Sequence, residues 1–354
     1  MAGGIGSRFW PFSTHQNPKQ FLDILGTGRS LIQLTFDRLS KICPVNQIYI
    51  VTNSDYKGLI ADQLPEIPNG NVLFEPVRRN TAPCVAYGCY KIHHENPDAN
   101  ILVAPSDHLI LKEEAYLNAI RSAFKASSEQ DILITLGITP TRPDTGYGYI
   151  QATDKELDTD NQILKVKTFT EKPNKELAQV FYESGDFSWN SGMFVWSSKS
   201  IVKSFEKNMI EIHELFKGGY GIYDTEKEHE FINEIYAQCV NISVDYAILE
   251  KANNIYVLPC DIGWTDLGTW GSLYNQVEHD DYKNAIVGDG VKLYNSSNNV
   301  ISNPTDKLVV IDGLENFIVV NTEDALLVCK KEDEQKIKQF VTDLSSTKKY
   351  KKYI

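Results

Sequence analysis

Short apolar runs alternate with longer amphipathic segments through the first 140 residues. The apolar runs, each typical of a buried strand, are residues 47–52, 72–76, 101–104 and 132–136. Helical spacing of apolar residues marks the segments 30–42, 55–64, 84–94 and 113–127. Strands that alternate with helices of this length predict a doubly wound α/β domain, whose mixed, mainly parallel sheet is covered on both faces.

After residue 140 the pattern is less regular. The segments ITPTRPDTGYGYI, KVKTFTEKPNKE and FSWNSGMFVW are rich in Gly, Pro, Thr and Asn, which predicts loops at strand ends. Further helices are expected at 201–216, 226–239 and 243–252, and a strand at 255–260. From about Asp281, six short β runs separated by turns and followed by a helix near 332–344 predict a small β-rich domain. We therefore expect one domain over residues 1–280 and another over 281–354, with KKYKKYI as a solvated end.

Composition narrows the class of protein. The 354 residues carry a net charge of −12, which argues against nucleic-acid binding because that task needs a cationic face. The six cysteines form no C-x-x-C pair, so a zinc site is not expected. With no signal peptide and no apolar run of membrane-spanning length, the sequence predicts a reduced cytoplasmic protein without a membrane partner.

The N-terminal segment MAGGIGSRFWPFSTHQNPKQF has the composition of a phosphate-binding loop. Gly3, Gly4 and Gly6 let main-chain N–H groups converge on an anion, and Arg8 and Lys19 add positive charge. The segment matches neither G-x-x-x-x-G-K-[ST] nor G-x-G-x-x-G, the two common phosphate loops. The alternative interpretation is a glycine turn with surface cations.

Such a loop normally follows a strand, because ligands of open α/β sheets bind beyond the carboxyl ends of strands. Here the loop begins at residue 1. Three explanations are possible: a leading strand is missing, the start codon was assigned to an internal methionine, or the loop is anchored in another way. We expect a truncated N-terminus that lacks the leading strand. Met1 to Gly3 held by other segments, with no empty strand position beside them, would contradict this expectation.

Seven segments carry a family resemblance: MAGGIGSRFWPFS…NPKQF, EPVRRNTAP, PSDH, TRPDTGYGYI, FTEKP, WNSGMF and GWTDLGTW. In this order they resemble the mannose-1-phosphate guanylyltransferases (GDP-mannose pyrophosphorylases) of the sugar nucleotidyltransferase superfamily. The likeness covers residues 1 to about 275 and is weaker in the β segment beyond. It implies a Rossmann-like nucleotidyltransferase domain, a β-helix-like C-terminal domain and a homodimer.

The sequence departs from the family pattern in two ways. The strand that normally precedes A-G-G is absent, which leaves open whether this polypeptide as written is active. No C-terminal isomerase domain of the kind found in longer bifunctional members fits within 354 residues, which limits the activity to nucleotidyl transfer.

The resemblance implies that a sugar phosphate oxygen attacks the α-phosphorus of GTP and expels diphosphate, a reaction catalysed by positioning and charge neutralisation. It assigns Asp107 and Asp266 to a divalent metal, Mg²⁺ or Mn²⁺, which typically takes one or two carboxylates. Read alone, each aspartate is as well explained as a helix cap or turn residue. His108 could orient the Asp107 carboxylate.

The resemblance places phosphate contacts on three cations. Arg8 would meet the triphosphate and the leaving diphosphate, Lys19 would contact phosphate, and Lys172 would bind the phosphate of the incoming sugar. A single lysine is by default a solvated surface charge. The catalytic set is therefore Arg8, Lys19, Asp107, Lys172 and Asp266.

The remaining site residues bind the two substrates. The base lies by family position at EPVRRNTAP, although spacing alone does not select guanine over adenine or uracil. The nucleotide-binding set is Gly3, Gly4, Gly6, Ser7, Arg79, Asn80, Thr81 and Ser106. Sugar hydroxyls would meet Gly146, Glu171 and Asn190. Trp189, Trp264 and Trp270 either stack on a ring or belong to the core.

The sequence thus predicts an enzyme that transfers GMP from GTP to α-D-mannose 1-phosphate and gives GDP-mannose. The alternatives are a pyrophosphorylase for another hexose 1-phosphate or base, and a catalytically silent paralogue that binds the sugar nucleotide as a regulator. The joint presence of the five catalytic candidates argues against the silent paralogue.

Overall fold

The computed structural model describes residues 1–4, 6–157 and 162–354, and its chain forms two compact units. Unit 1 consists of Met1–Gly3, Arg38–Pro105 and Ile110–Trp264. Unit 2 consists of Gly4–Asp37, Ser106–Leu109 and Thr265–Ile354. The sequence-based domain boundary at residue 281 remains a prediction.

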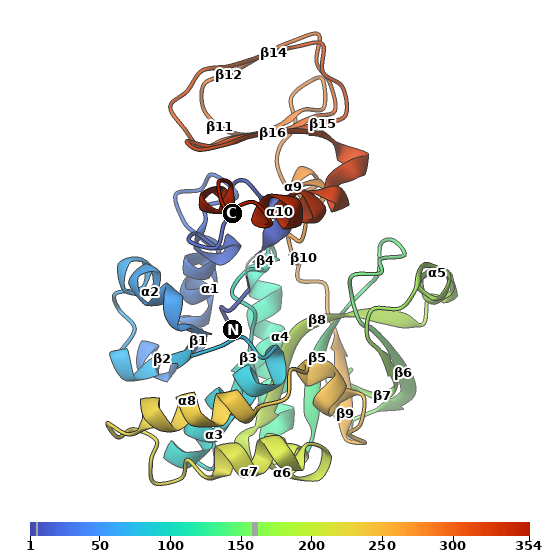
Figure 1. The fold of residues 1–354 in the computed structure, drawn as a ribbon. Coiled ribbons are helices and arrows are strands. Elements are labelled where there is room, and N and C mark those ends of the chain that lie inside the picture. The colour runs from blue at the N-terminus through green and yellow to red at the C-terminus, as the bar shows by residue number, and fades with distance from the viewer. Residues whose placement is uncertain (5, 158–161) are drawn as a thin grey trace. The chain divides into compact units, whose positions relative to one another are not determined.

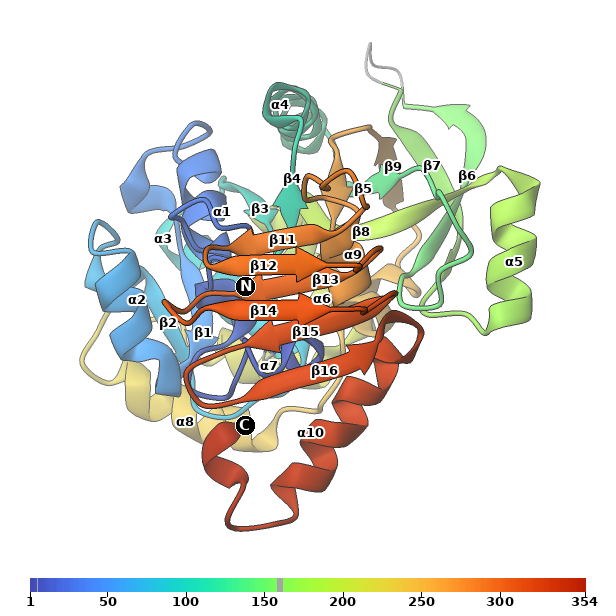
Figure 2. The same ribbon diagram turned by 90° about the horizontal axis from the view of Figure 1, so that it is seen from above.

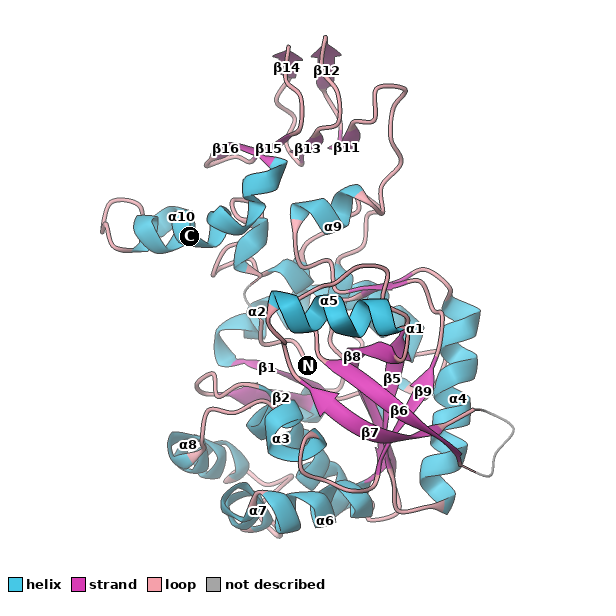
Figure 3. Ribbon diagram, turned by 90° about the vertical axis from the view of Figure 1, so that its right-hand side faces the viewer, coloured by secondary structure: helices cyan, strands magenta, loops and turns pink. Residues whose placement is uncertain are grey.

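A six-stranded mixed sheet is the centre of unit 1 (Figure 3). Its order is β3 (Asn100–Val103), β8 (Phe187–Ser197), β5 (Leu133–Ile138), β9 (Ile255–Pro259), β7 (Leu164–Thr170) and β6 (Tyr149–Glu156). β5 and β9 run parallel, and β8 runs antiparallel to both of its neighbours, β3 and β5. A separate parallel pair is formed by β1 (Ile50–Asn53) and β2 (Val72–Glu75).

Helices cover both faces of this sheet, as the predicted α/β class requires (Figure 1). Alternate residues of β8 enter two different core clusters, Phe194 and Trp196 in one and Trp189 and Val195 in the other. The first cluster includes side chains of α3 (Thr81–Glu95), α6 (Ser198–Asn208), α7 (Ile210–Lys217) and α8 (Glu228–Gln238). The second includes side chains of α4 (Glu113–Glu129) and α5 (Lys175–Ser184). Unit 1 also contains α2 (Lys57–Gln63), η3 (Val45–Gln47), η4 (Ser54–Tyr56) and η5 (Asn69–Asn71).

Of the segments predicted as loops after residue 140, the first is a loop up to Gly148, and β6 begins at the next residue. The other two contain strands: β7 covers the first half of KVKTFTEKPNKE, and β8 covers all of FSWNSGMFVW. The polar residues in the first half of β8, including Asn190 and Ser191, hide its strand character because they are buried without being apolar. The ladder between β5 and β8 is irregular between Thr135 and Gly137, next to these polar positions.

Two helix predictions need smaller corrections. The single helix expected over 201–216 is interrupted at Met209, where α6 ends and α7 begins. The helix expected over 243–252 is a short π-helix, η6 (Asp245–Leu249). The π form is uncommon and frequently occurs at functional sites.

Unit 2 contains the N-terminal loop and the C-terminal β segment. It begins with the short turns η1 (Ser7–Phe9) and η2 (Lys19–Phe21) and the first residues of α1 (Leu31–Leu39). At points where the chain passes between the units it forms the short strands β4 (Leu109–Ile110) and β10 (Trp264–Thr265). The helix α9 (Trp270–Tyr274) then leads to the β segment, which η7 (Lys331–Lys336), α10 (Ile337–Ser345) and η8 (Lys351–Tyr353) follow.

All six predicted β runs of this segment are strands. They are β11 (Ala285–Gly288), β12 (Val291–Tyr294), β13 (Val300–Asn303), β14 (Val309–Asp312), β15 (Phe317–Asn321) and β16 (Leu326–Lys330). β11, β13 and β15 stack in parallel as one sheet and β12 and β14 as another (Figure 2), so the chain winds as a coil. Buried asparagines join successive turns: Asn299 Nδ2 donates to Asn284 Oδ1 at 2.9 Å, and Phe317 N donates to Asn299 Oδ1 at 2.8 Å.

The C-terminal tail differs from expectation, and the N-terminus is held by main-chain hydrogen bonds. The tail is not wholly solvated, since Ile354 is only 8% exposed and Trp10 Nε1 donates to the carbonyl of Tyr353 at 2.6 Å. At the start, Ala2 N donates to Val51 O at 2.8 Å and the Met1 amino group to Ala104 O at 2.9 Å. The expected leading strand remains a prediction. Among the described residues, no helix has both the length and the apolar character needed to cross a membrane.

Candidate active site

The predicted charged cluster in unit 2 is organised around Lys19. Pro18 in extended conformation precedes η2 and turns the Lys19 side chain inward, where it is 5% exposed. Its ammonium donates to Asp107 Oδ2 at 2.9 Å and to the main-chain carbonyl of Asp266 at 2.6 Å. Lys19 therefore contacts two other predicted site residues, the more distant of which lies 247 positions away in the sequence.

Gly6 allows the N-terminal loop to pass close to this lysine. Its φ of 66° lies in the left-handed region, and a Cβ at this position would stand 2.4 Å from the Cβ of Lys19. The neighbouring turn is fixed by Gln20, whose Nε2 donates to the carbonyl of Gly4 at 3.0 Å. The Arg8 guanidinium extends to Gln335 Oε1 at 3.0 Å in an exposed position. The loop is thus shaped by its fit to Lys19 and Gln20.

The electrostatics around Asp107 favour its ionised form. Burial disfavours the carboxylate, but Lys19 and then His108 outweigh this effect and hold the pKa of Asp107 below its ordinary value. His108 Nε2 lies 3.9 Å from Asp107 Oδ1. The side chain of Asp107 remains 31% exposed, so an anionic ligand oxygen is available to a metal ion at this position.

Asp266 belongs to a tight turn with a strained residue. Its Oδ1 accepts from Gly268 N at 2.9 Å, and the next residue, Leu267, is fully buried with a φ of 44°. A bulky residue in the left-handed region is an outlier that only a constraining environment maintains. The Asp266 carbonyl in this turn accepts from the Lys19 ammonium.

The donor chemistry of this cluster fits Mg²⁺ or Mn²⁺. Asp107 and Asp266 offer carboxylate oxygens, the ligands that such hard cations prefer. Within the described part of the chain, no group of three or more His, Cys, Asp or Glu side chains could hold a metal. Two carboxylates leave most coordination positions to phosphate oxygens and water, which is the usual arrangement for Mg²⁺ at a nucleotide.

Ser106, predicted to bind nucleotide, lies next to Asp107 in the same segment. Its hydroxyl is buried and has no hydrogen-bond partner among the described residues. Its carbonyl accepts from Thr35 Oγ1 at 3.4 Å, which fixes the segment rather than the hydroxyl. A buried hydroxyl without a partner costs free energy unless a ligand or water satisfies it.

The predicted sugar-binding residues meet in unit 1. Glu171 is 9% exposed, follows β7 and accepts a hydrogen bond from the ammonium of Lys172. A Cβ on Gly148 would lie 2.5 Å from Glu171 Oε2 and 3.4 Å from the Cβ of Asn190, so these two side chains flank this glycine. Gly146 donates its N–H to Asp144 Oδ1 at 2.8 Å, and its contact with the sugar remains a prediction. Gly148 is a close-packed position that sequence reasoning missed.

Lys172 has an unusual backbone. Its φ is 45°, in a region that non-glycine residues rarely adopt. Its side chain is 60% exposed, which leaves the ammonium accessible beside Glu171. Strained non-glycine residues concentrate at ligand sites, so this geometry supports a functional role for the TEKP segment.

Asn190 belongs to a polar network that also contains two residues missed by the sequence analysis. Thr135 Oγ1 donates to Asn190 Oδ1 at 2.9 Å, and Asn190 Nδ2 donates to Asp245 Oδ1 at 2.8 Å. Burial, and then the neighbouring Glu171, raise the pKa of Asp245 to about 6. The signal in the sequence was a single carboxylate within the otherwise apolar run VDYAIL.

The three residues predicted to contact the base lie at the start of α3. Arg79 donates to the carbonyls of Tyr236 and Ala237, both at 3.2 Å. Asn80 has a φ of 67° and its side chain caps α3 by accepting from Thr81 N at 2.9 Å. These residues therefore build the helix start, and their contact with a base remains a prediction.

The loop before α3 also holds Gly3. Arg78, which the sequence analysis did not select, donates from Nε to the Gly3 carbonyl at 3.3 Å and from Nη2 to Tyr56 Oη at 2.5 Å. The Gly3 carbonyl is thereby fixed beside the segment that precedes Asn80.

The three candidate tryptophans are packed. Trp270 is fully buried with its ring centroid 4.8 Å from that of Phe9. Trp189 and Trp264 both make edge contacts with Tyr147, at 5.0 and 5.2 Å between centroids. Trp270 is accordingly a core residue.

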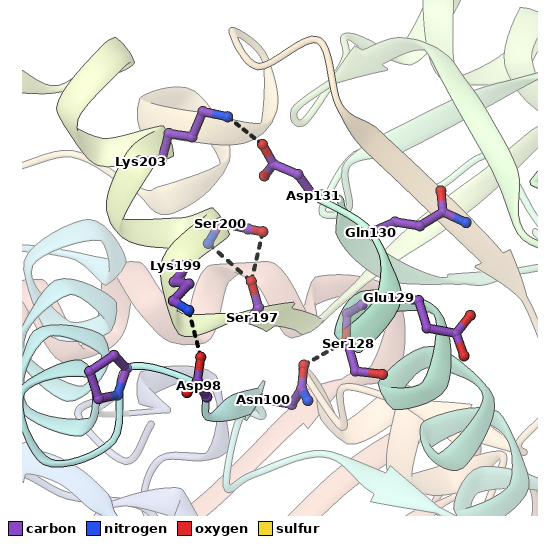
Figure 4. A pocket seen from close by; sticks show the side chains of 12 residues that line it. Asp98, Asn100, Ser128, Glu129, Gln130, Asp131, Ser197, Lys199, Ser200 and Lys203 are labelled. Carbon is purple, nitrogen blue, oxygen red and sulfur yellow. Dashed lines mark hydrogen bonds and ion pairs between the residues drawn. The ribbon is translucent and has the colours of Figure 1, made fainter.

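Two cavities in unit 1 contain none of the predicted site residues. One, of about 480 Å³, lies between the ends of β3, α4 and β8 (Figure 4). Its lysines are neutralised, since Lys199 Nζ donates to Asp98 and Lys203 Nζ to Asp131, both at 2.5 Å. The other, of about 590 Å³, is lined largely by apolar side chains, all from the part of the sequence that runs from Leu39 to Phe124.

Comparisons with known proteins agree along the whole chain. Residues 1–283 match the family described as nucleotidyl transferase, and residues 291–344 match the MannoseP isomerase/GMP-like beta-helix domain. A mannose-1-phosphate guanylyltransferase of Klebsiella pneumoniae is 36% identical over 358 residues, covering 100% of this chain and 75% of the relative. Alginate biosynthesis protein AlgA of Pseudomonas putida is 35% identical over 347 residues, covering 97% of this chain and 70% of the relative. A crystal structure described as mannose-1-phosphate geranyltransferase of Thermus thermophilus superposes with a TM-score of 0.88 at 27% identity, covering 98% of each chain.

Proposed function

The chain belongs to the nucleotidyl transferase family and is an enzyme, and from this premise we propose that it transfers GMP from GTP to α-D-mannose 1-phosphate, giving GDP-mannose and diphosphate. The observation that supports the proposal most is the Lys19 ammonium, which donates to the Asp107 carboxylate and to the main-chain carbonyl of Asp266. Phosphoryl chemistry needs cations and carboxylates beside the phosphates, and needs no side-chain nucleophile.

In the proposed reaction an oxygen of the sugar phosphate attacks the α-phosphorus, and the bond from that phosphorus to the departing diphosphate breaks. Lys19 and Arg8 neutralise phosphate charge, and the N-terminal glycine loop with Ser7 and Ser106 orients the nucleotide. Asp107 and Asp266 would hold Mg²⁺ or Mn²⁺, which when bound supplies further charge neutralisation on the phosphates. Arg79, Asn80 and Thr81 contribute the base contacts.

The sugar phosphate is assigned to residues of unit 1. Lys172 binds its phosphate as a cation held at a strained and exposed position. Glu171 accepts from a sugar hydroxyl, and Asn190 forms a further hydrogen bond to the sugar. Binding by fixed donors and acceptors of this kind rejects analogues whose hydroxyls are displaced.

The test is diphosphate release from the full chain. Each of several nucleoside triphosphates is combined with each of several hexose 1-phosphates, with and without Mg²⁺. The proposal expects release only with Mg²⁺ and fastest with GTP and mannose 1-phosphate. Faster release with another pair would identify a pyrophosphorylase of different specificity, and binding of GDP-mannose without release from any pair would identify a silent paralogue.

We further propose a cytoplasmic homodimer. The β segment of unit 2 supports association because it exposes Leu308, Val310, Leu326 and Val328, each at 49% or more. Light scattering during size-exclusion chromatography tests this, and a monomeric mass at micromolar concentration would contradict it.

A further inference from the structure

The amide of Asn190 is held from both ends by different elements. Its Oδ1 accepts from Thr135 Oγ1 on β5 at 2.9 Å and from Gly192 N at 3.2 Å, which uses both lone pairs of the oxygen. Its Nδ2 donates one hydrogen to Asp245 Oδ1 at 2.8 Å. The second amide hydrogen has no partner among the described residues.

Asp245 stands at a junction in unit 1. It is the first residue of η6, and the residues before it are bonded to the start of α3: Val244 N donates to Thr81 Oγ1 at 2.9 Å, and Ala82 N to Ile242 O at 3.1 Å. The aspartate is therefore fixed by its main chain, and Asn190 is oriented against a fixed carboxylate. A carboxylate accepts and does not donate, so it compels the amide to turn its nitrogen toward it.

We propose that Asp245 is a positioning residue that fixes the Asn190 amide as a hydrogen-bond donor to the sugar, and thereby contributes to the choice of hexose 1-phosphate. This inference rests on the proposed function, because Asn190 must contact the sugar for its orientation to matter. Glu171 on the same site supplies the complementary acceptor. Together they form one donor and one acceptor for neighbouring hydroxyl groups.

Loss of Asp245 affects which end of the Asn190 amide, the oxygen or the nitrogen, faces the sugar. Without a negative partner, the orientation of the amide depends on Thr135 and Gly192 alone, and an amide that rotates presents its oxygen to the sugar, beside the carboxylate of Glu171. The site then offers two acceptors where it offered a donor and an acceptor. Substrate hydroxyls matched to the original pair leave a buried group unsatisfied, which weakens binding.

The principal experiment is Asp245→Asn, which keeps the size of the side chain and removes its charge. We expect the KM for mannose 1-phosphate to rise about tenfold, because a hydrogen bond to a buried group is lost. The kcat and the KM for GTP should change by less than about twofold, since those interactions are untouched. Asp224→Asn, which removes a carboxylate paired with Lys91 elsewhere in unit 1, is the matched control and should leave all three constants unchanged.

A reciprocal variant tests whether position 190 must donate a hydrogen bond when the bond between the two positions is kept. In Asp245→Asn combined with Asn190→Asp, the pair can still bond, because Asn at 245 donates to Asp at 190, which also accepts from Thr135 and Gly192. This variant should recover the thermal stability of the wild type but keep the raised KM for mannose 1-phosphate, because position 190 no longer has an N–H to donate. Recovery of the KM together with stability would overturn the proposal. The reciprocal variant thus tests the donor at position 190, and Asp245→Asn tests the partner that orients it.

The final comparison distinguishes this inference from the function on which it rests. Asn190→Ala should raise the KM for mannose 1-phosphate at least as much as Asp245→Asn. If Asn190→Ala leaves that KM unchanged, the assignment of Asn190 to the sugar is wrong. If Asn190→Ala raises it and Asp245→Asn does not, the positioning role of Asp245 is wrong while the sugar contact stands.

Discussion

Asp107 in unit 2 and Asp245 in unit 1 are two aspartates of candidate substrate sites with opposite surroundings. Burial disfavours ionisation of both, but at Asp107 the Lys19 ammonium outweighs it and the pKa is lowered. At Asp245 the neighbouring Glu171 adds to the effect of burial, and the pKa rises to about 6. The Lys19 cation favours the ionised form of Asp107, whereas Asp245 is ionised only when the pH exceeds its raised pKa.

The difference fits the two kinds of ligand. A triphosphate and its metal ion require permanent charges, which a paired lysine and aspartate provide. A sugar hydroxyl requires oriented donors and acceptors, and the charge at Asp245 serves to orient Asn190. The comparison therefore predicts that changes in unit 2 reduce the rate and changes in unit 1 reduce the affinity for the sugar.

Asp107→Asn tests the charged side of the comparison and has the largest expected effect. Diphosphate release should fall by about 100- to 1,000-fold, because the variant removes both a proposed metal ligand and the partner of Lys19. The control is Asp131→Asn, which removes an exposed carboxylate paired with Lys203 and should retain full activity. Equal losses in the two variants would remove Asp107 from the catalytic set.

Lys172→Ala tests the proposed phosphate contact in unit 1. The KM for mannose 1-phosphate should rise by about 30- to 100-fold through loss of a charge-assisted contact, and that for GTP far less. Lys167→Ala removes an exposed lysine of β7 from the strand that leads to Lys172, and should change neither constant. An equal rise in both KM values would exclude Lys172 from its proposed role.

Gly6→Ala tests whether the loop depends on its close approach to Lys19. It should lower the free energy of unfolding by about 2 kcal/mol, because a left-handed backbone and a contact with Lys19 Cβ are both penalised. Gly28→Ala is the matched control: Gly28 has a φ of 82° but open space around its Cβ, so only the backbone cost of about 1 kcal/mol is expected. Urea unfolding at constant pH measures both, and equal losses would show that the contact with Lys19 is unimportant.

The pH dependence of stability gives the smallest expected effect. In the folded protein Asp245 titrates at about 6, above its ordinary value of 3.8, so between these values the folded state binds more protons than the unfolded state. Its contribution therefore makes stability fall as pH rises from 4 to 6, by roughly 1–2 kcal/mol. Asp107 acts in the opposite sense, since its lowered pKa contributes stability above its ordinary value that is lost at lower pH.

The measurement is urea unfolding at several pH values for wild type and Asp245→Asn. The variant should show a shallower decline between pH 4 and 6. Identical slopes in the two proteins would mean that Asp245 titrates normally and that its surroundings do not disfavour its charge.

Much of this molecule was predictable because its signals are local. The alternation of apolar runs and amphipathic segments predicted α1 to α4 and β1 to β5, apart from the two-residue β4. The predicted α/β domain with a mixed sheet is confirmed. The six β runs after residue 281 were all correct. The family resemblance carried by seven short segments is confirmed by the matches along the whole chain.

The rest depends on contacts between distant segments. β8 was missed because Asn190 and Ser191 read as loop residues, although they are buried inside a strand by partners from β5 and η6. Nothing local marks Lys172 or Leu267 as residues with positive φ, since neither is glycine. Asp245 read as an ordinary residue at a helix start, because its partner lies 55 positions away.

In unit 2 the sheet of β11, β13 and β15 has an antiparallel neighbour at each end. On one side β16 runs antiparallel to β15, and on the other His279 bridges Ala285 in antiparallel fashion. A further parallel strand from another molecule would find both ends of this sheet already paired with a segment that runs the opposite way. Endless stacking into fibres is the hazard of every repetitive β architecture, and these reversed segments oppose it along this sheet.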